Sequence, residues 1–207
     1  MSVKVGMKQS NNVKIAITGG IGSGKSSVSD IVANCGYKVL SCDKIYSELL
    51  SQGVFNSALT DAFGNILLKD GSLDRKKLSA IVFSDSSALK KLNEITHPCI
   101  IQTALGAMNK IGLNFCEVPL LFENGFERFF DVVIVILRGA NERITAITKR
   151  DGINEEEAKK RIKQQFDYDN SGFARYYVLH NYGDLADLKS KTLEILEKIE
   201  KKYFQKK

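Results

Sequence analysis

The feature that most constrains this chain is a glycine-rich loop at residues 19–26, which reads Gly-Gly-Ile-Gly-Ser-Gly-Lys-Ser. A glycine, four residues and then Gly-Lys-Ser is the spacing of a phosphate-binding P-loop. An apolar run at 13–17 precedes the loop and a helix-like segment at 26–35 follows it. This strand–loop–helix order is the context that such a loop requires, so we predict that the chain binds a nucleoside triphosphate.

The residue types of the loop explain its chemistry. Glycines allow positive φ and let the backbone approach a ligand closely, so successive amides can point into one concavity at a helix N-terminus. Lys25 is a mobile charge for the β- and γ-phosphates, and the Ser26 hydroxyl is an oxygen ligand for Mg²⁺. The rival dinucleotide pattern fails, because its third glycine falls on Lys25 or Ser27. The residues predicted to bind nucleotide are Gly20, Gly22, Ser23, Gly24, Lys25 and Ser26.

Composition restricts the class of protein. The net charge of +6 suits either nucleic acid or anionic small substrates, but basic residues are not interleaved with aromatics, so we expect no nucleic-acid partner. Four scattered cysteines without a Cys-x-x-Cys pair favour reduced thiols over a zinc site. No apolar run is long enough for a membrane span, and residues 1–12 lack the apolar region of a secretory signal. We therefore expect a cytoplasmic protein, with a monomer favoured.

The pattern of apolar runs predicts an α/β fold, the three-layer P-loop NTPase architecture with a parallel sheet. A helical insertion without a convincing strand is expected from about 53 to 110, where Pro98 is placed to begin a helix. Pro119 lies inside the third expected strand, which should therefore bulge or stop pairing near its end. The expected strands are 13–17, 37–42, 115–122, 131–137 and 176–179.

Four residues outside the loop are further candidates for function. Asp43 follows the second expected strand, where it is either a general base or the cap of the next helix. Glu123 follows the third strand, as does the carboxylate that holds Mg²⁺ through water in P-loop proteins. His97, before Pro98, is more often a packed turn residue than a catalyst. Arg150 belongs to a basic segment that is either a lid or a solvated helix face.

A series of motifs carries a resemblance to a known family. The motifs are the P-loop, Cys42-Asp43-Lys44-Ile45, Thr96-His97-Pro98, Val118-Pro119-Leu120-Leu121-Phe122-Glu123, Arg150-Asp151-Gly152, Arg161 to Gln165 and Asn181-Tyr182-Gly183. In this order they resemble the dephospho-CoA kinases, over nearly the whole chain. The resemblance implies an ATP- and Mg²⁺-dependent kinase that phosphorylates the ribose 3′-hydroxyl of dephospho-CoA.

The same resemblance implies roles for individual residues. Gly22 to Ser27 would hold the ATP phosphates, with Asn181 also at the nucleotide. Asp43 would accept the proton of the ribose hydroxyl, and Arg150 would stabilise charge on the transferring phosphoryl group. The substrate-binding residues would be His97, Leu121 and Glu123.

The implied organisation has a nucleotide-binding core and two inserted parts. An N-terminal tail, residues 1–12, comes first. The core comprises residues 13–52, 114–140 and 175–207. The CoA-substrate subdomain comprises residues 53–113, and the lid comprises residues 141–174. The sequence departs from the family at five positions, one of which, Ser27 for the common Thr, is conservative. Ser41 stands where the family has the first Asp of Asp-x-Asp, Ala146 replaces an arginine, Ser171 a lysine and Tyr176 an Asp.

Two other functions fit the P-loop. One is a nucleoside monophosphate kinase, which the long helical insertion disfavours. The other is a non-enzymatic ATP-binding module that switches a partner, which would need switch segments that directly follow strands. Release of ADP in the presence of dephospho-CoA would discriminate these readings.

Overall fold

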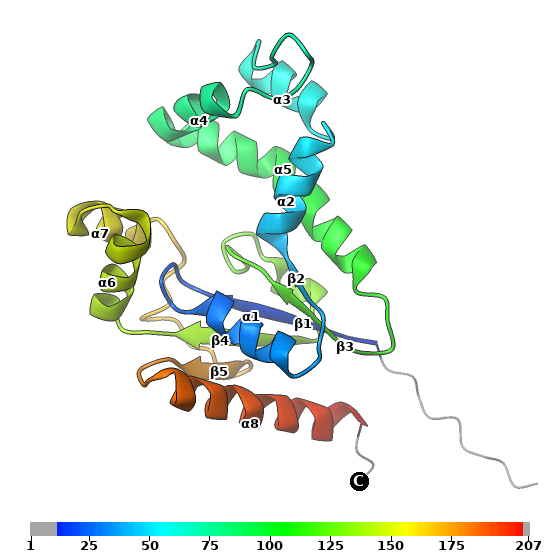
Figure 1. The fold of residues 1–207 in the computed structure, drawn as a ribbon, viewed down its shortest axis with the longest axis vertical. Coiled ribbons are helices and arrows are strands. Elements are labelled where there is room, and N and C mark those ends of the chain that lie inside the picture. The colour runs from blue at the N-terminus through cyan, green and yellow to red at the C-terminus, as the bar shows by residue number, and fades with distance from the viewer. Residues whose placement is uncertain (1–11, 205–207) are drawn as a thin grey trace, which may run out of the picture. The chain divides into compact units, whose positions relative to one another are not determined.

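The computed structural model describes residues 12–204, which form two compact units (Figure 1). Unit 2 comprises residues 40–107, and unit 1 comprises the described residues on either side of it. The predicted N-terminal tail lies outside the described residues, except for Asn12, which begins the first strand. Among the described helices, none is long and apolar enough to cross a membrane.

A five-stranded sheet organises unit 1, in the order β2-β3-β1-β4-β5. Neighbours β3, β1, β4 and β5 all pair in parallel, with Ile15 opposite Phe115 on one side and Val132 on the other. The α/β fold with a parallel sheet is therefore confirmed. The strands are β1 (Asn12–Gly19), β2 (Val39–Ser41), β3 (Gly112–Glu117), β4 (Val132–Leu137) and β5 (Tyr177–His180).

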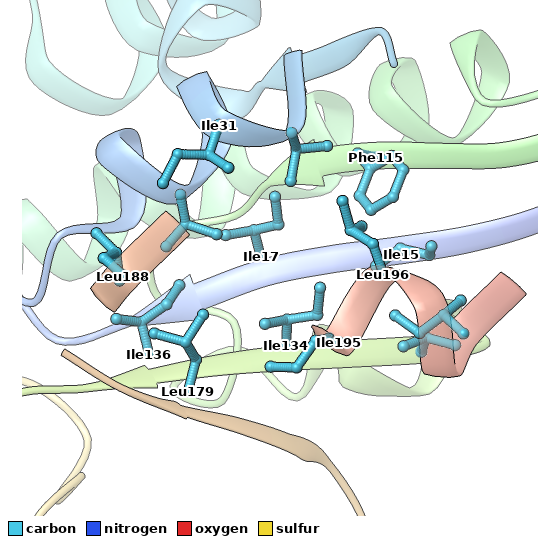
Figure 2. Packing of buried hydrophobic residues seen from close by; sticks show 14 of the residues in the cluster. Ile15, Ile17, Ile31, Phe115, Ile134, Ile136, Leu179, Leu188, Ile195 and Leu196 are labelled. Carbon is cyan, nitrogen blue, oxygen red and sulfur yellow. The ribbon is translucent and has the colours of Figure 1, made fainter. Parts of the chain in front are cut away.

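The core of unit 1 lies between this sheet and two helices, α1 (Lys25–Asn34) and α8 (Leu185–Phe204). Figure 2 shows Ile31 and Leu188 of these helices directed toward Ile17, Ile136 and their strand neighbours. Each such buried aliphatic side chain contributes about 1.5–3 kcal/mol relative to an exposed one. This packing fixes β1 and α1, and with them the loop that joins them.

Three further elements of unit 1 follow β3 and β4: η1 (Phe126–Phe129), α6 (Ala140–Asp151) and α7 (Glu155–Lys163). Asn154 caps α7, because its side-chain oxygen accepts from the Glu157 N–H at 2.9 Å. The cap position of α6 is Gly139, so Asn141 lies in the first turn of that helix and does not cap it.

Unit 2 is helical, as its hydrophobic spacing predicts. Its helices are α2 (Cys42–Ser51), α3 (Asn56–Phe63), α4 (Arg75–Ser84) and α5 (Ser86–Ala107), and α5 packs against the other three. The expected helix start at Pro98 is wrong, because Pro98 lies inside α5. The long apolar face of α5, with Leu92, Ile100 and Ile101 buried, continues through the proline and outweighs one lost backbone bond.

Two strand-end expectations are also corrected. The third strand ends at Glu117 rather than Phe122, because Pro119 has no N–H for the ladder and Leu120 has a φ of 55°. The cap of α2 is Ser41, whose hydroxyl accepts from the Lys44 N–H at 3.4 Å. Asp43 lies in the first turn of α2 and is exposed, so the alternative reading of Asp43 as the cap is wrong.

Candidate active site

The topology of the sheet brings four strand ends to the P-loop. The carboxyl ends of parallel strands share one edge of a sheet, and ligands of open α/β sheets lie outside that edge. The P-loop follows β1 at the centre of this edge. Glu117 ends the neighbouring β3, Arg138 follows β4 and Asn181 follows β5. Each of these three side chains forms a hydrogen bond to the P-loop or to the first turn of α1.

The carbonyls of five consecutive P-loop residues accept hydrogen bonds from side chains. Lys25 Nζ donates to the carbonyls of Gly19 at 2.8 Å and Gly20 at 3.1 Å. The next three carbonyls are held from outside the loop. Arg143 Nε donates to Ile21 O at 3.0 Å, Arg138 Nη1 to Gly22 O at 3.3 Å, and Asn181 Nδ2 to Ser23 O at 2.8 Å.

These bonds set the direction of the loop peptides. A peptide whose carbonyl is held by an outer donor turns its N–H toward the opposite side, which forms the anion-binding concavity of such loops. The loop continues into the N-terminus of α1, where unpaired amides and the helix dipole add further positive potential. The arrangement therefore fits the phosphates of a nucleotide.

Close packing explains the glycine at position 22. Its φ is +77°, and a Cβ there would lie 2.8 Å from the carbonyl oxygen of Arg143. Residues other than glycine are strained at this φ, and the close approach of the loop to α6 leaves no room for a Cβ atom. The glycine therefore lets the loop lie directly against the helix that carries Arg143.

Ser23 is predicted to bind nucleotide and is 1% exposed. Its hydroxyl finds no hydrogen-bond partner in the described part of the chain. A buried polar atom of this kind calls for a ligand or an ordered water. The observation is consistent with a ligand at this loop and leaves the predicted role of Ser23 as a prediction.

Glu117 is a candidate functional residue that the sequence reasoning missed. Its carboxylate accepts from Ser26 Oγ at 3.2 Å and from Ser29 Oγ at 2.8 Å. A hydroxyl and a carboxylate side by side are the hard oxygen ligands that Mg²⁺ prefers. The available signal was the proline two residues later, which ends the strand at Glu117 and places its carboxylate at the functional edge.

Glu123, predicted to contact substrate and also compared with a Mg²⁺ carboxylate, has a different contact. Its Oε1 accepts the backbone N–H of Phe166 at 2.9 Å. Phe166 belongs to a segment, residues 165–169, that we call the strap. The strap also places Tyr168 OH 3.5 Å from Thr18 Oγ1, and burial followed by the charge of Glu123 raises the pKa of that phenol. Glu123 thus holds the strap in this structure.

Arg150 lies in the last turn of α6 and is paired with its neighbour. Its Nε donates to Asp151 Oδ1 at 2.6 Å, and Arg161 of α7 donates to Asp151 Oδ2 at 3.0 Å. The hydrogen bond from Arg150 holds the pKa of the Asp151 carboxyl below its usual range. To bind a phosphoryl group, the Arg150 guanidinium would have to break its hydrogen bonds to the Asp151 carboxylate. The catalytic role of Arg150 therefore stays a prediction.

The remaining predicted residues are placed as follows. Asp43 and His97 belong to unit 2, in the first turn of α2 and the middle of α5. Leu121 is fully buried, so its side chain is enclosed by protein. Ser27 is exposed in the first turn of α1. Their predicted contacts with substrate or nucleotide stay predictions.

The class of protein follows from this geometry. A P-loop on the central strand of a parallel sheet, whose serine meets a carboxylate from the next strand, is the nucleotide site of a P-loop protein, the class to which the P-loop kinases belong.

Comparison with known proteins narrows the class. The family model described as dephospho-CoA kinase matches residues 13–187. A dephospho-CoA kinase from Fusobacterium nucleatum is 38% identical over 89% of this chain and 97% of its own. The chain therefore belongs to the dephospho-CoA kinase family. Its activity is that of this phosphotransferase family, the final step of coenzyme A biosynthesis.

Solved structures agree with this membership. A dephospho-CoA kinase from Campylobacter jejuni is 30% identical, covers 91% of this chain and 98% of its own, and has a TM-score of 0.66. The protein TT1252 from Thermus thermophilus is 31% identical, covers 90% of this chain and 97% of its own, and has a TM-score of 0.73.

Gly22 and Gly36 form a matched pair of positions for substitution. Gly22→Ala and Gly36→Ala both place a side chain at positive φ, which costs about 1–2 kcal/mol of stability. The space around Gly36 is open, whereas that at Gly22 is filled by Arg143. We expect Gly22→Ala to abolish ATP binding in calorimetry and Gly36→Ala to retain it. Equal affinities in the two variants would contradict the close-approach account.

Proposed function

We propose that this protein transfers the γ-phosphoryl group of ATP to the ribose 3′-hydroxyl of dephospho-CoA, giving coenzyme A and ADP. The observation that carries the proposal is the P-loop whose carbonyls from Ile21 to Ser23 are held by side chains from outside the loop, in a chain of this family. Phosphoryl transfer asks little covalent chemistry of the protein, so positioning and electrostatics account for the rate.

In this proposal the P-loop is the donor site. The loop amides other than those of Ile21 and Ser23, which donate to Gln165 Oε1 and Gly20 O in this structure, bind the β- and γ-phosphate oxygens together with the N-terminus of α1. Lys25 exchanges its bonds to the Gly19 and Gly20 carbonyls for phosphate oxygens, because a flexible ammonium interacts more strongly with an anion than with neutral acceptors. Its charge then stabilises the negative charge that develops between the β- and γ-phosphates.

Ser26 and Glu117 are the residues that would hold Mg²⁺. Mg²⁺ typically takes one or two protein oxygens beside substrate phosphates and keeps its remaining waters, so this small set fits. When bound, the ion neutralises charge on the β- and γ-oxygens. Ser29 orients the second oxygen of Glu117.

Asp43 is the proposed general base. It is an exposed carboxylate in the first turn of α2, and since Ser41 caps the helix, Asp43 is not needed for that purpose. The proton of the 3′-hydroxyl passes to this carboxylate as the oxygen forms its bond to the γ-phosphorus. The bond from that phosphorus to the bridging oxygen breaks, and ADP leaves with the electron pair.

Four further residues complete the proposed site, one at the transferring phosphoryl group and three at the acceptor. Arg150, released from Asp151, stabilises charge on the transferring phosphoryl group. His97 on α5, together with Leu121 and Glu123, contributes to acceptor binding. The family membership favours dephospho-CoA as acceptor over a nucleoside monophosphate, and catalysis over a switching role.

The role of Asp43 is tested by Asp43→Asn, which keeps the shape of the side chain but cannot accept the proton. We expect kcat to fall by about 10²–10⁴, with ATP affinity and melting temperature close to those of the wild type. Steady-state kinetics and thermal unfolding measure both. The control is Ser41→Ala, which removes the cap and should cost about 1 kcal/mol of stability while leaving proton transfer in place. A kcat for Asp43→Asn near the wild-type value would exclude the base assignment.

The metal assignment is tested by Glu117→Gln. We expect this variant to need a higher Mg²⁺ concentration for half-maximal rate at saturating ATP, because one anionic ligand is lost. Glu123→Gln is the matched comparison, since Glu123 bonds the Phe166 backbone in this structure. If Glu123→Gln shifts the Mg²⁺ requirement and Glu117→Gln does not, Glu117 is not the metal carboxylate.

A further inference from the structure

Arg143 is a buried cation that lies against the P-loop. It is 2% exposed although it sits on α6, a helix with an otherwise largely exposed face. Its Nε donates to Ile21 O at 3.0 Å, and a Cβ built on Gly20 would lie 2.5 Å from its Nη2. Both the bond and the packing therefore place the guanidinium in direct contact with the loop backbone.

The burial of this charge is costly. Desolvation lowers the pKa of Arg143, and the nearby Asp169 opposes the shift. An arginine nevertheless stays protonated in proteins, so a full positive charge remains beside the phosphate loop. The Asp169 carboxylate, 3.6 Å from Nη1, is half exposed and compensates the charge in part.

The strap holds the same residue, Ile21, through its other backbone group. Gln165 Oε1 accepts the Ile21 N–H at 2.6 Å, while Arg143 donates to the Ile21 carbonyl. Ile21 is thus held at both of its backbone groups by side chains from distant parts of the sequence. The ion pair between Arg143 and Asp169 joins the two holders, because Asp169 belongs to the strap.

We propose that Arg143 is a positioning residue that orients the P-loop for nucleotide binding and couples the loop to the strap. Its Nε is used by a loop carbonyl and its Nη1 faces Asp169, so it acts through the loop rather than as a phosphate ligand. Its charge also raises the affinity of the loop for anions. The inference rests on the proposed binding of ATP phosphates by this loop.

The test is the affinity of purified variants for ADP and ATP, measured by calorimetry without acceptor substrate. We expect Arg143→Gln to weaken nucleotide binding by about 10- to 100-fold, the effect of losing a charged hydrogen bond. Arg143→Lys should restore little of the affinity, because an ammonium lacks the planar fork that reaches both Ile21 O and Asp169. The KM for dephospho-CoA should stay at its wild-type value.

Ile147→Val is the matched control for packing. Ile147 lies on the same helix, is fully buried and packs beside Gly22, but its aliphatic side chain cannot donate a hydrogen bond. We expect this variant to lower the melting temperature and to keep the nucleotide affinity. An Arg143→Gln variant that melts earlier but binds ADP as the wild type does would overturn the proposal.

A second variant covers the case in which Arg143→Gln does not fold. Gln165→Ala removes the strap's acceptor for the Ile21 N–H without changing the charge beside the loop, so the protein should stay folded. We expect weaker ADP binding in this variant too, and unchanged ADP binding would contradict the coupling. Failure of the wild-type protein to bind ADP would instead overturn the proposed function.

Discussion

The structure of this site depends on the outward anchoring of the P-loop carbonyls. A flexible glycine-rich loop has many conformations, and few of them turn successive amides toward one point. Here the carbonyls from Gly19 to Ser23 each accept a side-chain hydrogen bond. The conformational entropy of the loop is therefore reduced before a ligand arrives, which lowers the cost of binding. The same bonds explain why so polar a loop is stable at the edge of an apolar core.

The side chains that contact the loop and the first turn of α1 follow different strands because the sheet is parallel. In the order β2-β3-β1-β4-β5, the central strand carries the P-loop and its neighbours end beside it. β3 supplies Glu117, the segment after β4 supplies Arg138 and Arg143, and β5 leads into Asn181. The packing of α1 and α8 on the sheet fixes these strands, so the core positions the site (Figure 2).

The elements that depend on local sequence patterns could be predicted, whereas contacts between residues far apart in the sequence could not. The P-loop, the parallel sheet and the helical insertion follow from local patterns of glycine and apolar residues. Arg143 contacts the loop across more than a hundred residues, and no local pattern marks such a contact. Asn181 was expected at the nucleotide only through the family resemblance, which does not give its hydrogen bond to Ser23 O. Glu117 was missed because apolar residues after it extend the apparent strand to Phe122, whereas Pro119 ends the pairing. Ser41, a departure from the family pattern, proved to be the cap of α2.

The central claim is that this anchored loop delivers a phosphoryl group to dephospho-CoA. The most direct measurement is ADP release by the purified protein with ATP and Mg²⁺, compared for dephospho-CoA, AMP, CMP and adenosine as acceptors. The account predicts rapid ADP release with dephospho-CoA alone, together with a product that carries a new 3′-phosphomonoester by ³¹P nuclear magnetic resonance. Equal or faster release with AMP or CMP, or phosphorylation at another hydroxyl, would contradict it.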